Sequence, residues 1–493
     1  MRLTRKEFLL AGAAGVAALA PRPAAAAGDG VIDVRRHGAR GDGVGDDAGP
    51  IQAAIDALPP GAGTVLLPPG VYRLTRPLEI LDDATHGRHG VRLVGSAGGA
   101  SGGGLGCTLE WDGPSDAPML RLWSRDCIVS GLAFRVMPGR RALAAIDVDQ
   151  AADRTGACTN NTFEHVLVTR GRGALRDGIV IGRRASGNAE LLGFSDCYFE
   201  DIEQSCVDIA STTGQSKAHR FYKCAFARAR VGIRQTTGSF VTFGCSFGYL
   251  TEAAVRLRSI TDYIAINESD SEGCARLLAC DGGSGASWAV KISGGRYALN
   301  ALAGDGRFID FTNGGPLLIE NVLFGENVEP RFRIRAAAAE PGAVLLSLGN
   351  VFPNDQPYDM SGRVRLVALG NRGRGPAGEV VALDDEIAAG VDASGRLALA
   401  TVASISATAV KSQNLRGAVT IAGASSTAAV VFDRPEPDGH YFVSAVASGT
   451  QGRPRPGATR VAVAEKTAAG FTIELEAAPG PDSSVAVDWI LIR

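Results

Sequence analysis

The sequence predicts an all-β protein in which a parallel β-helix, a solenoid of short stacked strands, precedes a smaller β domain. Glycine is abundant, at 64 of 493 residues, and aromatic residues make up only 6%. Short runs of Val, Ile, Leu and Phe end in Gly, Asn, Asp or Ser, which is typical of many short strands. Strand-like units recur at an irregular spacing of roughly 20 to 35 residues, as the coils of a solenoid would.

The first 27 residues are expected to be an export signal rather than part of the fold. Arg5 and Lys6 precede an apolar stretch from Phe8 to Ala20, and Ala25-Ala26-Ala27 provides an A-x-A cleavage site. Lys6 stands where a twin-arginine signal has its second arginine, so Tat-like and Sec export both remain open. A membrane anchor is disfavoured because the apolar run is shorter than the roughly 18 residues that span a bilayer. We therefore expect a periplasmic or extracellular protein.

Charge and cysteine content exclude several classes of function. The formal net charge is −2 at pH 7, which gives no long-range attraction to nucleic acid or to an anionic membrane. The nine cysteines, an odd number, show no metal-ligand spacing. Cys197, Cys224 and Cys245 occupy matching places in the repeat, so we expect packed thiols at stacked corners rather than disulfides.

Residues 31–80 carry the most specific local pattern. They contain Val31-Ile32-Asp33-Val34, Gly38-Ala39-Arg40-Gly41-Asp42-Gly43, Asp46-Asp47, Ile51-Gln52-Ala53-Ala54-Ile55-Asp56 and Gly63-Thr64-Val65-Leu66-Leu67-Pro68-Pro69-Gly70-Val71-Tyr72. This order indicates strand, turn, helix and strand. Asp46 or Asp47 can accept from the free N–H groups at the helix start, and the two isoleucines lie on one helical face. We expect a helix over 47–57 to close one end of the stack.

These motifs resemble the N-terminal signature of the pectate-lyase superfamily, whose usual form is close to GAxGDGxxDDTxAIQxAIDA followed by GGxVxxPxGxY. Gly49-Pro50 departs from the usual Thr-x-Ala before Ile51-Gln52. The resemblance implies a right-handed parallel β-helix, and it covers the cap. In the tailspikes, hydrolases, lyases and epimerases that share it, the chemistry lies on later coils. The diagnostic blocks of pectate lyases and polygalacturonases do not occur in this sequence, so no catalytic residue is carried over.

Two units recur through the predicted β-helix, which we place at residues 28–370. In the first, a small or polar corner residue precedes an aromatic or aliphatic one, as in Cys197 with Phe199, and these residues would stack as ladders. The second is a short alternating strand, whose period of two places every second residue outward. Stacked in register, the outward residues form one column. Its expected members are Asp147, Val180, Asp208, Arg234, Arg256, Leu278, Asp310, Arg333 and Arg365.

This column is the candidate active site. Adjacent parallel strands lie about 4.8 Å apart, so Asp147 and Asp208, two rungs apart, should have Cα atoms roughly 10 Å apart. An inverting glycosidase needs carboxyl groups about 6.5–9.5 Å apart, one as acid and one as base. Asp147 and Asp208 are therefore the candidate acid and base of a hydrolase. The neighbouring Arg234 is the third candidate catalytic residue, because it would supply fixed positive charge in a lyase.

The same column is compatible with a lyase, because its arginines supply fixed positive charge for a sugar carboxylate. The candidate substrate-binding residues are Arg256, Arg258 and Asp149. The aspartates of this segment could also bind calcium through their oxygens. In pectate lyases an arginine is the usual base and aspartates hold calcium. A structural interpretation stays open as well, since opposite charges on neighbouring rungs form surface ion pairs worth about 0–1 kcal/mol each.

A second group of carboxylates, Glu268, Asp270 and Glu272, falls where other coils place an aromatic residue. Carboxylates cannot share an apolar interior unpaired. Either the coil bulges there, which we favour, or the cluster lines a groove, with or without a metal ion. Tyr249 and Tyr263 nearby could offer stacking faces to a sugar.

The pattern changes near residue 370. Residues 371–414 have the polar, Gly-, Pro-, Ala- and Ser-rich composition of a linker. Residues 415–493 hold short strands that predict a β-sandwich. This unit resembles the small C-terminal β domains of phage tail fibres and secreted β-helix proteins. The resemblance implies trimerisation or glycan attachment, and hence a homotrimer.

Export, the cap signature and the Asp/Arg column together favour a secreted enzyme, a polysaccharide lyase or glycoside hydrolase, that cleaves an acidic polysaccharide. The alternative is a non-catalytic, tailspike-like adhesion protein that uses the stack as a rigid rod. A close carboxylate pair in an open groove would favour hydrolysis. An arginine beside calcium-binding aspartates would favour β-elimination, and a wall of paired charges would favour adhesion.

Overall fold

The computed structural model describes residues 30–59, 61–83, 86–95, 106–150, 157–184, 188–260, 262–280, 290–312, 315–383, 387–391, 397–401, 416–432 and 442–492. The predicted signal segment, residues 1–27, lies outside the described residues. The chain divides into two compact units, Met1–Leu399 and Ala400–Arg493.

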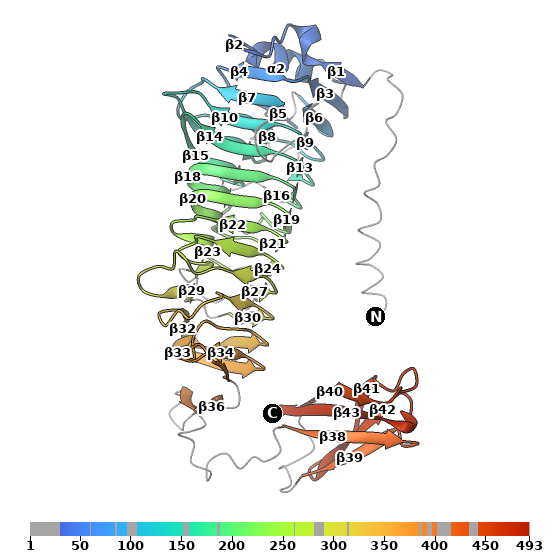
Figure 1. Ribbon diagram of the computed structural model, residues 1–493. Coiled ribbons are helices and arrows are strands. Elements are labelled where there is room, and N and C mark those ends of the chain that lie inside the picture. The colour runs from blue at the N-terminus through green and yellow to red at the C-terminus, as the bar shows by residue number, and fades with distance from the viewer. Residues whose placement is uncertain are drawn as a thin grey trace. The chain divides into compact units, whose positions relative to one another are not determined.

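The first unit is a right-handed parallel β-helix, which confirms the predicted fold class (Figure 1). Its strands stack into three long faces. Face 1 contains β1 (Val31–Asp33), β3 (Gly63–Leu67), β6 (Val91–Gly95), β9 (Ile128–Ser130), β13 (Thr162–Glu164), β17 (Gly193–Ser195), β19 (His219–Tyr222), β21 (Phe240–Phe243), β24 (Ile264–Asn267), β27 (Val290–Ser293) and β30 (Leu317–Glu320).

Face 2 follows face 1 in each coil. It contains β2 (Asp42–Asp46), β4 (Gly70–Leu74), β7 (Cys107–Trp111), β10 (Ala133–Val136), β14 (Leu167–Gly171), β18 (Tyr198–Ile209), β20 (Ala225–Gln235), β22 (Ser246–Gly248), β25 (Asp270–Glu272), β28 (Arg296–Tyr297) and β31 (Leu323–Phe324). Because β18 and β20 are long, they bend and continue into face 3.

Face 3 completes each coil. It contains β5 (Leu78–Leu81), β8 (Pro118–Trp123), β11 (Arg141–Val148), β15 (Ala174–Ile181), the second halves of β18 and β20, β23 (Ala253–Leu257), β26 (Leu278–Cys280), β29 (Arg307–Phe311) and the first parts of β32 (Arg333–Leu348) and β33 (Tyr358–Leu369). The later parts of β32 and β33 continue face 1 after β30. A short parallel pair, β12 (Cys158–Thr159) with β16 (Ala189–Glu190), lies outside the three faces.

The interior is filled by side chains that repeat from coil to coil. On face 1, Phe163 stacks on Phe194 with ring centroids 4.7 Å apart. On face 2, the rings of Phe199 and Phe226 lie 5.4 Å apart, and Phe247 continues the ladder at 5.1 Å. The predicted aromatic ladder is confirmed. Parallel strands in register align like residues, and the stacked rings bury large apolar area in every coil.

The corner between faces 1 and 2 is a single residue in the left-handed conformation. His165, Asp196 and Lys223 each have φ of 51°, and Gly244 and Glu268 continue the corner with φ of 57° and 46°. Gly, Asn and Asp tolerate this region best, which explains the small and polar residues at these positions. The residue that follows each corner points inward. At three successive coils these residues are the buried Cys197, Cys224 and Cys245, so the cysteines stack at corners as packed thiols.

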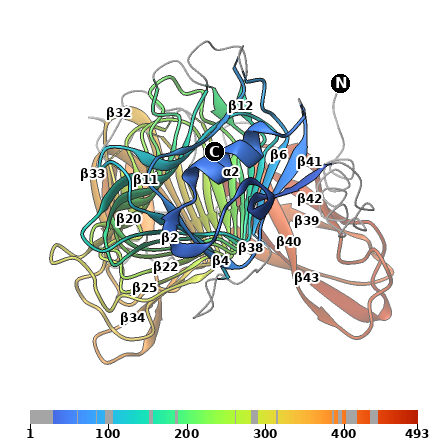
Figure 2. The same ribbon diagram turned by 90° about the horizontal axis from the view of Figure 1, so that it is seen from above.

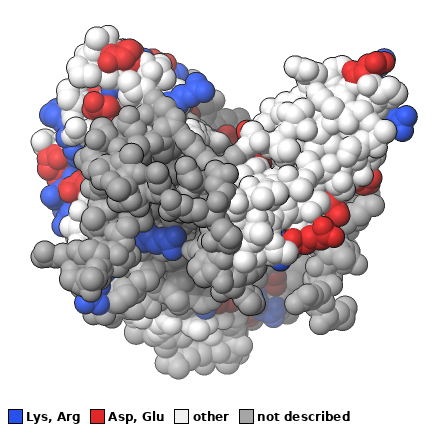
Figure 3. Space-filling model, turned by 90° about the horizontal axis from the view of Figure 1, so that it is seen from below, with Lys and Arg blue, Asp and Glu red and all other residues white. Residues whose placement is uncertain are grey.

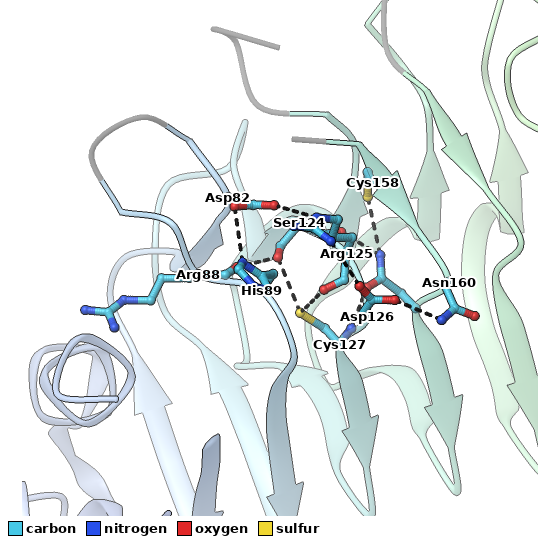
Figure 4. Close-up of polar contacts among 10 residues, drawn as sticks. Asp82, Arg88, His89, Ser124, Arg125, Asp126, Cys127, Cys158 and Asn160 are labelled. Carbon is cyan, nitrogen blue, oxygen red and sulfur yellow. Dashed lines mark hydrogen bonds and ion pairs between the residues drawn. The ribbon is translucent and has the colours of Figure 1, made fainter. Parts of the chain in front are cut away.

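Another polar stack holds the corner that precedes face 1 (Figure 4). Asn161 Nδ2 donates to Ser124 O at 2.7 Å, and Asn161 Oδ1 accepts from Cys127 N at 2.9 Å. Asn160 Nδ2 donates to Asp126 Oδ1 at 2.9 Å. These bonds satisfy backbone groups that the curving chain would otherwise leave unpaired, and they fix one coil to the next.

The carboxylates Glu268, Asp270 and Glu272 do not occupy the aromatic position, so the favoured bulge is wrong. β25 pairs in register with β22 and β28, and Ser271 lies between Phe247 and Tyr297 in the inward ladder. The three carboxylates point outward and are exposed. The sequence register was off by one residue, which exchanges the two sides of a strand.

The predicted cap is confirmed: α2 (Ala48–Asp56) lies across the N-terminal end of the stack (Figure 2). It buries Ile51 and Ile55 against the first coil. Asp46 Oδ1 accepts from Ala48 N at 3.1 Å. Asp47 accepts from Arg40 N and Gly41 N instead, so it secures the loop before the helix. The preceding 3-10 helix, η1, spans Val34–His37.

The solenoid continues past residue 370, the boundary expected from the sequence. Asn371 Oδ1 accepts from Asn350 N at 2.9 Å, and Leu383 belongs to the same core. β34 (Arg372–Arg374) and β35 (Val380–Ala382) form an antiparallel hairpin. Compositional change therefore does not mark the end of the stack, because the last coil carries a polar hairpin. β36 (Ile387–Val391) pairs with β37 (Leu397–Thr401).

The second unit is the predicted β-sandwich, made of two antiparallel three-stranded sheets. One contains β38 (Arg416–Gly423), β43 (Gly480–Ile492) and β40 (Phe442–Gln451); the other contains β39 (Thr427–Val431), β42 (Gly470–Leu475) and β41 (Val461–Thr467). Phe471 packs edge-on to Trp489 in its core, with centroids 5.1 Å apart. Figure 3 shows that the described surface seen from below is mostly uncharged, with separate groups of acidic and basic side chains. In the described part of the chain, no helix has the length and apolar character needed to span a membrane.

Candidate functional site

The outward column on face 3 exists, and its central register is as predicted. Asp147 pairs with Val180, Val180 with Asp208, Asp208 with Arg234, and Arg234 with Arg256. We call this surface the charged wall: its outward residues are Glu79, Arg121, Asp147, Val180, Asp208, Arg234, Arg256, Ala279, Asp310 and Arg335.

Three predicted members of the column are wrong. Ala279, rather than Leu278, follows Arg256, and Leu278 is buried. Arg335 takes the place expected for Arg333, because the pairing of β29 with β32 shifts by one residue. The column then continues to Asp359 instead of Arg365. Irregular coils and a β-bulge changed the register, and such changes leave little trace in a single sequence.

Asp208 and Arg234 form a two-pronged ion pair at the centre of the wall. Arg234 Nε donates to Asp208 Oδ1 at 2.9 Å, and Nη2 donates to Oδ2 at 2.6 Å. Asp208 is only 5% exposed, so the expectation of a freely exposed carboxylate is wrong for this residue. The paired geometry fixes the carboxylate orientation more tightly than a single hydrogen bond would.

The structure adds Asp177, which the sequence reasoning missed. Asp177 is 0% exposed, and neither of its carboxylate oxygens has a hydrogen-bond partner among the described residues. Arg234 Nη2 lies 3.5 Å from Asp177 Oδ1, while Arg176 Nε and Arg183 Nη2 lie 3.5 and 3.7 Å from Oδ2. One guanidinium therefore reaches two carboxylates, Asp177 and Asp208.

Burial raises the pKa of Asp177 to about 6, and the negative charge of Asp208 adds to this effect. The three arginines act in the opposite direction without cancelling it. The residue sits at the bend into face 3, just before Gly178. A Cβ at Gly178 would meet Cys206 O at 2.2 Å. In the sequence, the pair Asp177-Gly178 directly before an alternating strand was the signal that could have indicated this buried carboxylate.

Asp147 lies two rungs from Asp208 across the buried Val180. Its carboxylate accepts a hydrogen bond from Trp123 Nε1 at 3.1 Å. Burial raises the pKa of Asp147, although the Trp123 hydrogen bond and nearby arginines oppose the shift. Arg184 stacks over the Trp123 ring, with the guanidinium carbon 3.8 Å from the centroid. Asp147 therefore sits in a partly buried, partly apolar setting that favours its protonated form.

Asp149, expected to bind substrate, is 1% exposed and has a structural role. Its oxygens accept from Gln150 N and Arg184 N, each at 2.8 Å. Burial raises its pKa to about 6. Asp149 closes the turn after β11 and does not face the surface. Asp149 is buried although alternation predicted an exposed side chain, and its bond to Arg184 N ties it to the chain that follows β15.

The two remaining predicted substrate-binding residues, Arg256 and Arg258, differ in their exposure to solvent. Arg256 is half-buried and pairs with Glu252 on the same wall. Arg258 is exposed, immediately after β23, and its backbone N–H donates to Gln235 O. Arg256 therefore has its charge partly satisfied, whereas Arg258 extends the positive charge at the edge of the wall.

The three aspartates proposed as calcium ligands do not converge. Both oxygens of Asp149 are held by backbone N–H groups, and both oxygens of Asp208 by Arg234. Across the described ranges, no group of three or more His, Cys, Asp or Glu side chains is arranged to hold a metal ion. Asp147 alone offers too few ligands for a cation that takes six to eight oxygens.

Two of the three carboxylates, Asp270 and Glu272 on face 2, line a different hollow of about 900 Å³, whereas Glu268 lies at the corner before it. Its wall includes Asp270, Glu272, Arg296, Glu326 and Glu329. Ser246 Oγ donates to Asp270 at 2.6 Å, and Arg296 pairs with Glu326 at 2.6 Å. Asp270 and Glu326 are thus each engaged by a different partner. Among the described residues, no group of three or more potential metal ligands lies in this hollow.

Comparison with known proteins places the resemblance at the N-terminus. Residues 31–101 match the family described as rhamnogalacturonase A/epimerase, pectate lyase-like. Mannuronan C5-epimerase AlgE6 of Azotobacter vinelandii is 48% identical over 68 residues, which is 14% of this chain and 8% of that protein. The chain therefore matches only a small part of the length of its curated relatives. The family match at residues 31–101 contains the cap and the first coils.

Two solved structures align with much of this chain at low sequence identity, with TM-scores below 0.5. The A-module of mannuronan C5-epimerase AlgE4 from Azotobacter vinelandii aligns with a TM-score of 0.45 and 17% identity, covering 68% of this chain and 97% of that one. PfbA, a surface adhesin of Streptococcus pneumoniae, aligns with a TM-score of 0.46 and 13% identity, covering 75% and 98%. The resemblance to the pectate-lyase superfamily stated from the cap motif is confirmed.

Proposed function

We propose that the protein cleaves an acidic polysaccharide at the charged wall, with Asp147 and Asp208 as the acid and base. The spacing of these two residues carries the proposal: they occupy alternate rungs on either side of the apolar Val180. Two rungs correspond to about 10 Å between Cα atoms. Carboxyl groups separated by about 6.5–9.5 Å leave room for a water beside the sugar, as inverting hydrolysis requires.

The environments of the two carboxylates support different roles. Asp147 is partly buried beside Trp123, and its raised pKa favours a proton that can be given to the leaving oxygen. Asp208 is oriented by the two hydrogen bonds from Arg234, so its carboxylate is positioned to accept a proton from water. Asp177 acts through Arg234 as a positioning residue, because it is fully buried and cannot touch a substrate.

The substrate class is supported by two separate observations. Arg256 and the exposed Arg258 place positive charge beside the carboxylate pair. The curated relatives that match 14% of this chain are named mannuronan C5-epimerases, and mannuronan is a polymer of a uronic acid. We therefore infer a uronate-containing polymer as substrate. We also propose that the protein is exported to the periplasm or the extracellular space, where it would act on this polymer.

The test is a product assay on polygalacturonate and alginate. Hydrolysis predicts new reducing ends without a rise in absorbance at 235 nm, whereas β-elimination would produce that rise and would contradict the acid–base roles. Asp147→Asn and Asp208→Asn should each lower turnover at least 100-fold, within the range expected for losing a general acid or base. Asp310→Asn is the matched control, since Asp310 occupies the same column four rungs beyond Asp208 and pairs with Arg335.

One observation favours a non-catalytic adhesion protein as the second candidate. Most charges of the wall already have partners: Arg121 pairs with Glu79, Arg234 with Asp208, and Arg256 with Glu252. Such a protein would bind the polymer without producing new ends. A homotrimer, implied by the C-terminal unit, remains a prediction of both candidates. Light scattering of the full chain at three times the monomer mass would support it.

A further inference from the structure

Face 1 carries a shallow hollow of about 640 Å³ that is separate from the charged wall. We call it the aromatic groove. Its lining residues are Thr64, Arg92, Val94, Ile128, Ser130, Thr162, Glu164, Gly193, Phe194, Ser195, Arg220 and Tyr222. They come from six successive strands, β3, β6, β9, β13, β17 and β19, so the hollow runs along the axis of the helix. Small side chains at its centre, above all Gly193, make it concave.

Two arginines of the groove have no acidic partner in the part of the chain that the structure describes. Arg92 and Arg220 are exposed and stand in one outward column, through Ile128, Thr162 and Gly193. Four rungs at about 4.8 Å place them roughly 19 Å apart. Among the described residues, neither arginine lies within 4.0 Å of a carboxylate. Glu164 is the one acidic residue in the lining, so the groove carries an excess of unsatisfied positive charge.

Two large aromatic rings stand exposed where the groove ends. Tyr222 is 52% exposed and Phe243 is 45% exposed, and they occupy the same column on adjacent rungs of β19 and β21. Lys223 Nζ lies 5.4 Å from the centroid of the Tyr222 ring. Neighbouring large apolar side chains on an exposed sheet mark interaction sites more often than chance surface exposure. Their flat faces suit the apolar C–H face of a sugar ring.

We infer that the aromatic groove is a second, non-catalytic binding site for an anionic polysaccharide chain lying along the helix axis. The unpaired Arg92 and Arg220 would bind acidic groups at separate points along the polymer. Tyr222 and Phe243 would stack on sugar rings, and the hydroxyls of Ser130, Thr162 and Ser195 would bond sugar hydroxyls between them. An extended polymer fits because the groove spans several rungs and is too shallow to enclose a compact ligand. The site lies on a different face from the charged wall, so binding there does not depend on cleavage.

The experiment is affinity electrophoresis of the full chain in gels that contain polygalacturonate, alginate or neutral dextran. The double variant Tyr222→Ala/Phe243→Ala should bind polygalacturonate or alginate at least tenfold more weakly than the wild type. Arg92→Ser/Arg220→Ser should weaken binding similarly and should make it less sensitive to salt, because charge contacts are screened. Val44→Ala/Leu369→Ala is the control, since these side chains are 74% and 42% exposed but lie outside the groove.

Equal retardation of the wild type and both groove variants by the two uronate polymers would overturn the inference. Failure of the wild type to bind either polymer more tightly than dextran would do the same. Circular dichroism melting of each variant shows whether it is folded. If the aromatic double variant melts early, the exposed-arginine variant carries the test. Affinity is read without product formation, so an inactive wild type would reject the proposed cleavage and leave this test intact.

Discussion

Two faces of one solenoid use the same strand geometry for opposite arrangements of charge. On the charged wall, Arg234 is engaged by Asp208 and Asp177. In the aromatic groove, Arg92 and Arg220 face outward without a carboxylate within 4.0 Å among the described residues. Parallel stacking aligns side chains on both faces at about 4.8 Å. Ordered columns alone therefore do not mark a binding surface. The groove differs from the wall because, among the described residues, its two arginines have no carboxylate within 4.0 Å.

Removing one arginine from each face tests whether the two faces differ in how their charges are partnered. Arg234→Ala should lower the free energy of unfolding by roughly 3 kcal/mol at pH 8, because it leaves two buried carboxylates without their shared guanidinium. Arg220→Ala should change it by less than about 0.5 kcal/mol, as is usual for an exposed residue without partners. Urea unfolding of the two variants beside the wild type measures both effects. Equal losses would contradict the distinction between the faces.

The buried Asp177 should make the stability of the protein depend on pH. Its pKa of about 6 lies above the ordinary 3.8, so the folded state holds its proton more tightly than the unfolded state. Stability therefore falls as pH rises from about 4 to about 6, and the loss is complete above that range. Asp177→Asn should remove this loss and be more stable than the wild type at pH 7.5, by an amount on the order of 2 kcal/mol.

Melting temperatures at pH 4.5 and pH 7.5 measure this difference. The gap between Asp177→Asn and the wild type should widen toward pH 7.5. Asp149 also has a raised pKa, but it is present in both proteins and cancels in the comparison. A variant that is less stable than the wild type at pH 7.5 would show that Arg176, Arg183 and Arg234 hold Asp177 ionised.

Removing divalent metal should have the smallest effect. The oxygens of Asp149 and Asp208 already accept hydrogen bonds from the protein, so the proposed calcium ligands are not free to gather around a cation. Dialysis against EDTA should leave turnover within twofold of the untreated protein and the melting temperature unchanged. Recovery of lost activity by added calcium would contradict this expectation.

The cap and the centre of the charged wall could both be predicted from the sequence, but for different reasons. The cap motif is local, with its strand, turn and helix signals within fifty residues or so, which makes such a segment easy to predict. The register from Asp147 to Arg256 was also predictable, because each of these residues directly follows a buried aliphatic one. At Leu278 and Arg333 the coils lengthen or shift register, and the same rule failed.

The residues that sequence reasoning missed lie where strands bend or end. Asp177 occupies the bend into face 3, where alternation does not reveal which side a residue faces. Tyr222 and Phe243 each stand directly before a left-handed corner and a buried cysteine, as Tyr222-Lys223-Cys224 and Phe243-Gly244-Cys245. An aromatic two residues before a stacked cysteine was therefore an available signal for an exposed ring.

The measurement that tests the account most directly compares kcat and KM of Asp208→Asn and Tyr222→Ala/Phe243→Ala on polygalacturonate and on a short oligogalacturonide. Asp208→Asn should lose at least 100-fold in kcat on both substrates while the polymer still retards it in gels. The aromatic variant should keep kcat on the short substrate and raise KM for the polymer about tenfold, equivalent to about 1.4 kcal/mol. Unchanged turnover of Asp208→Asn would contradict catalysis on the charged wall. An unchanged KM of the aromatic variant for the polymer would contradict polymer binding in the aromatic groove.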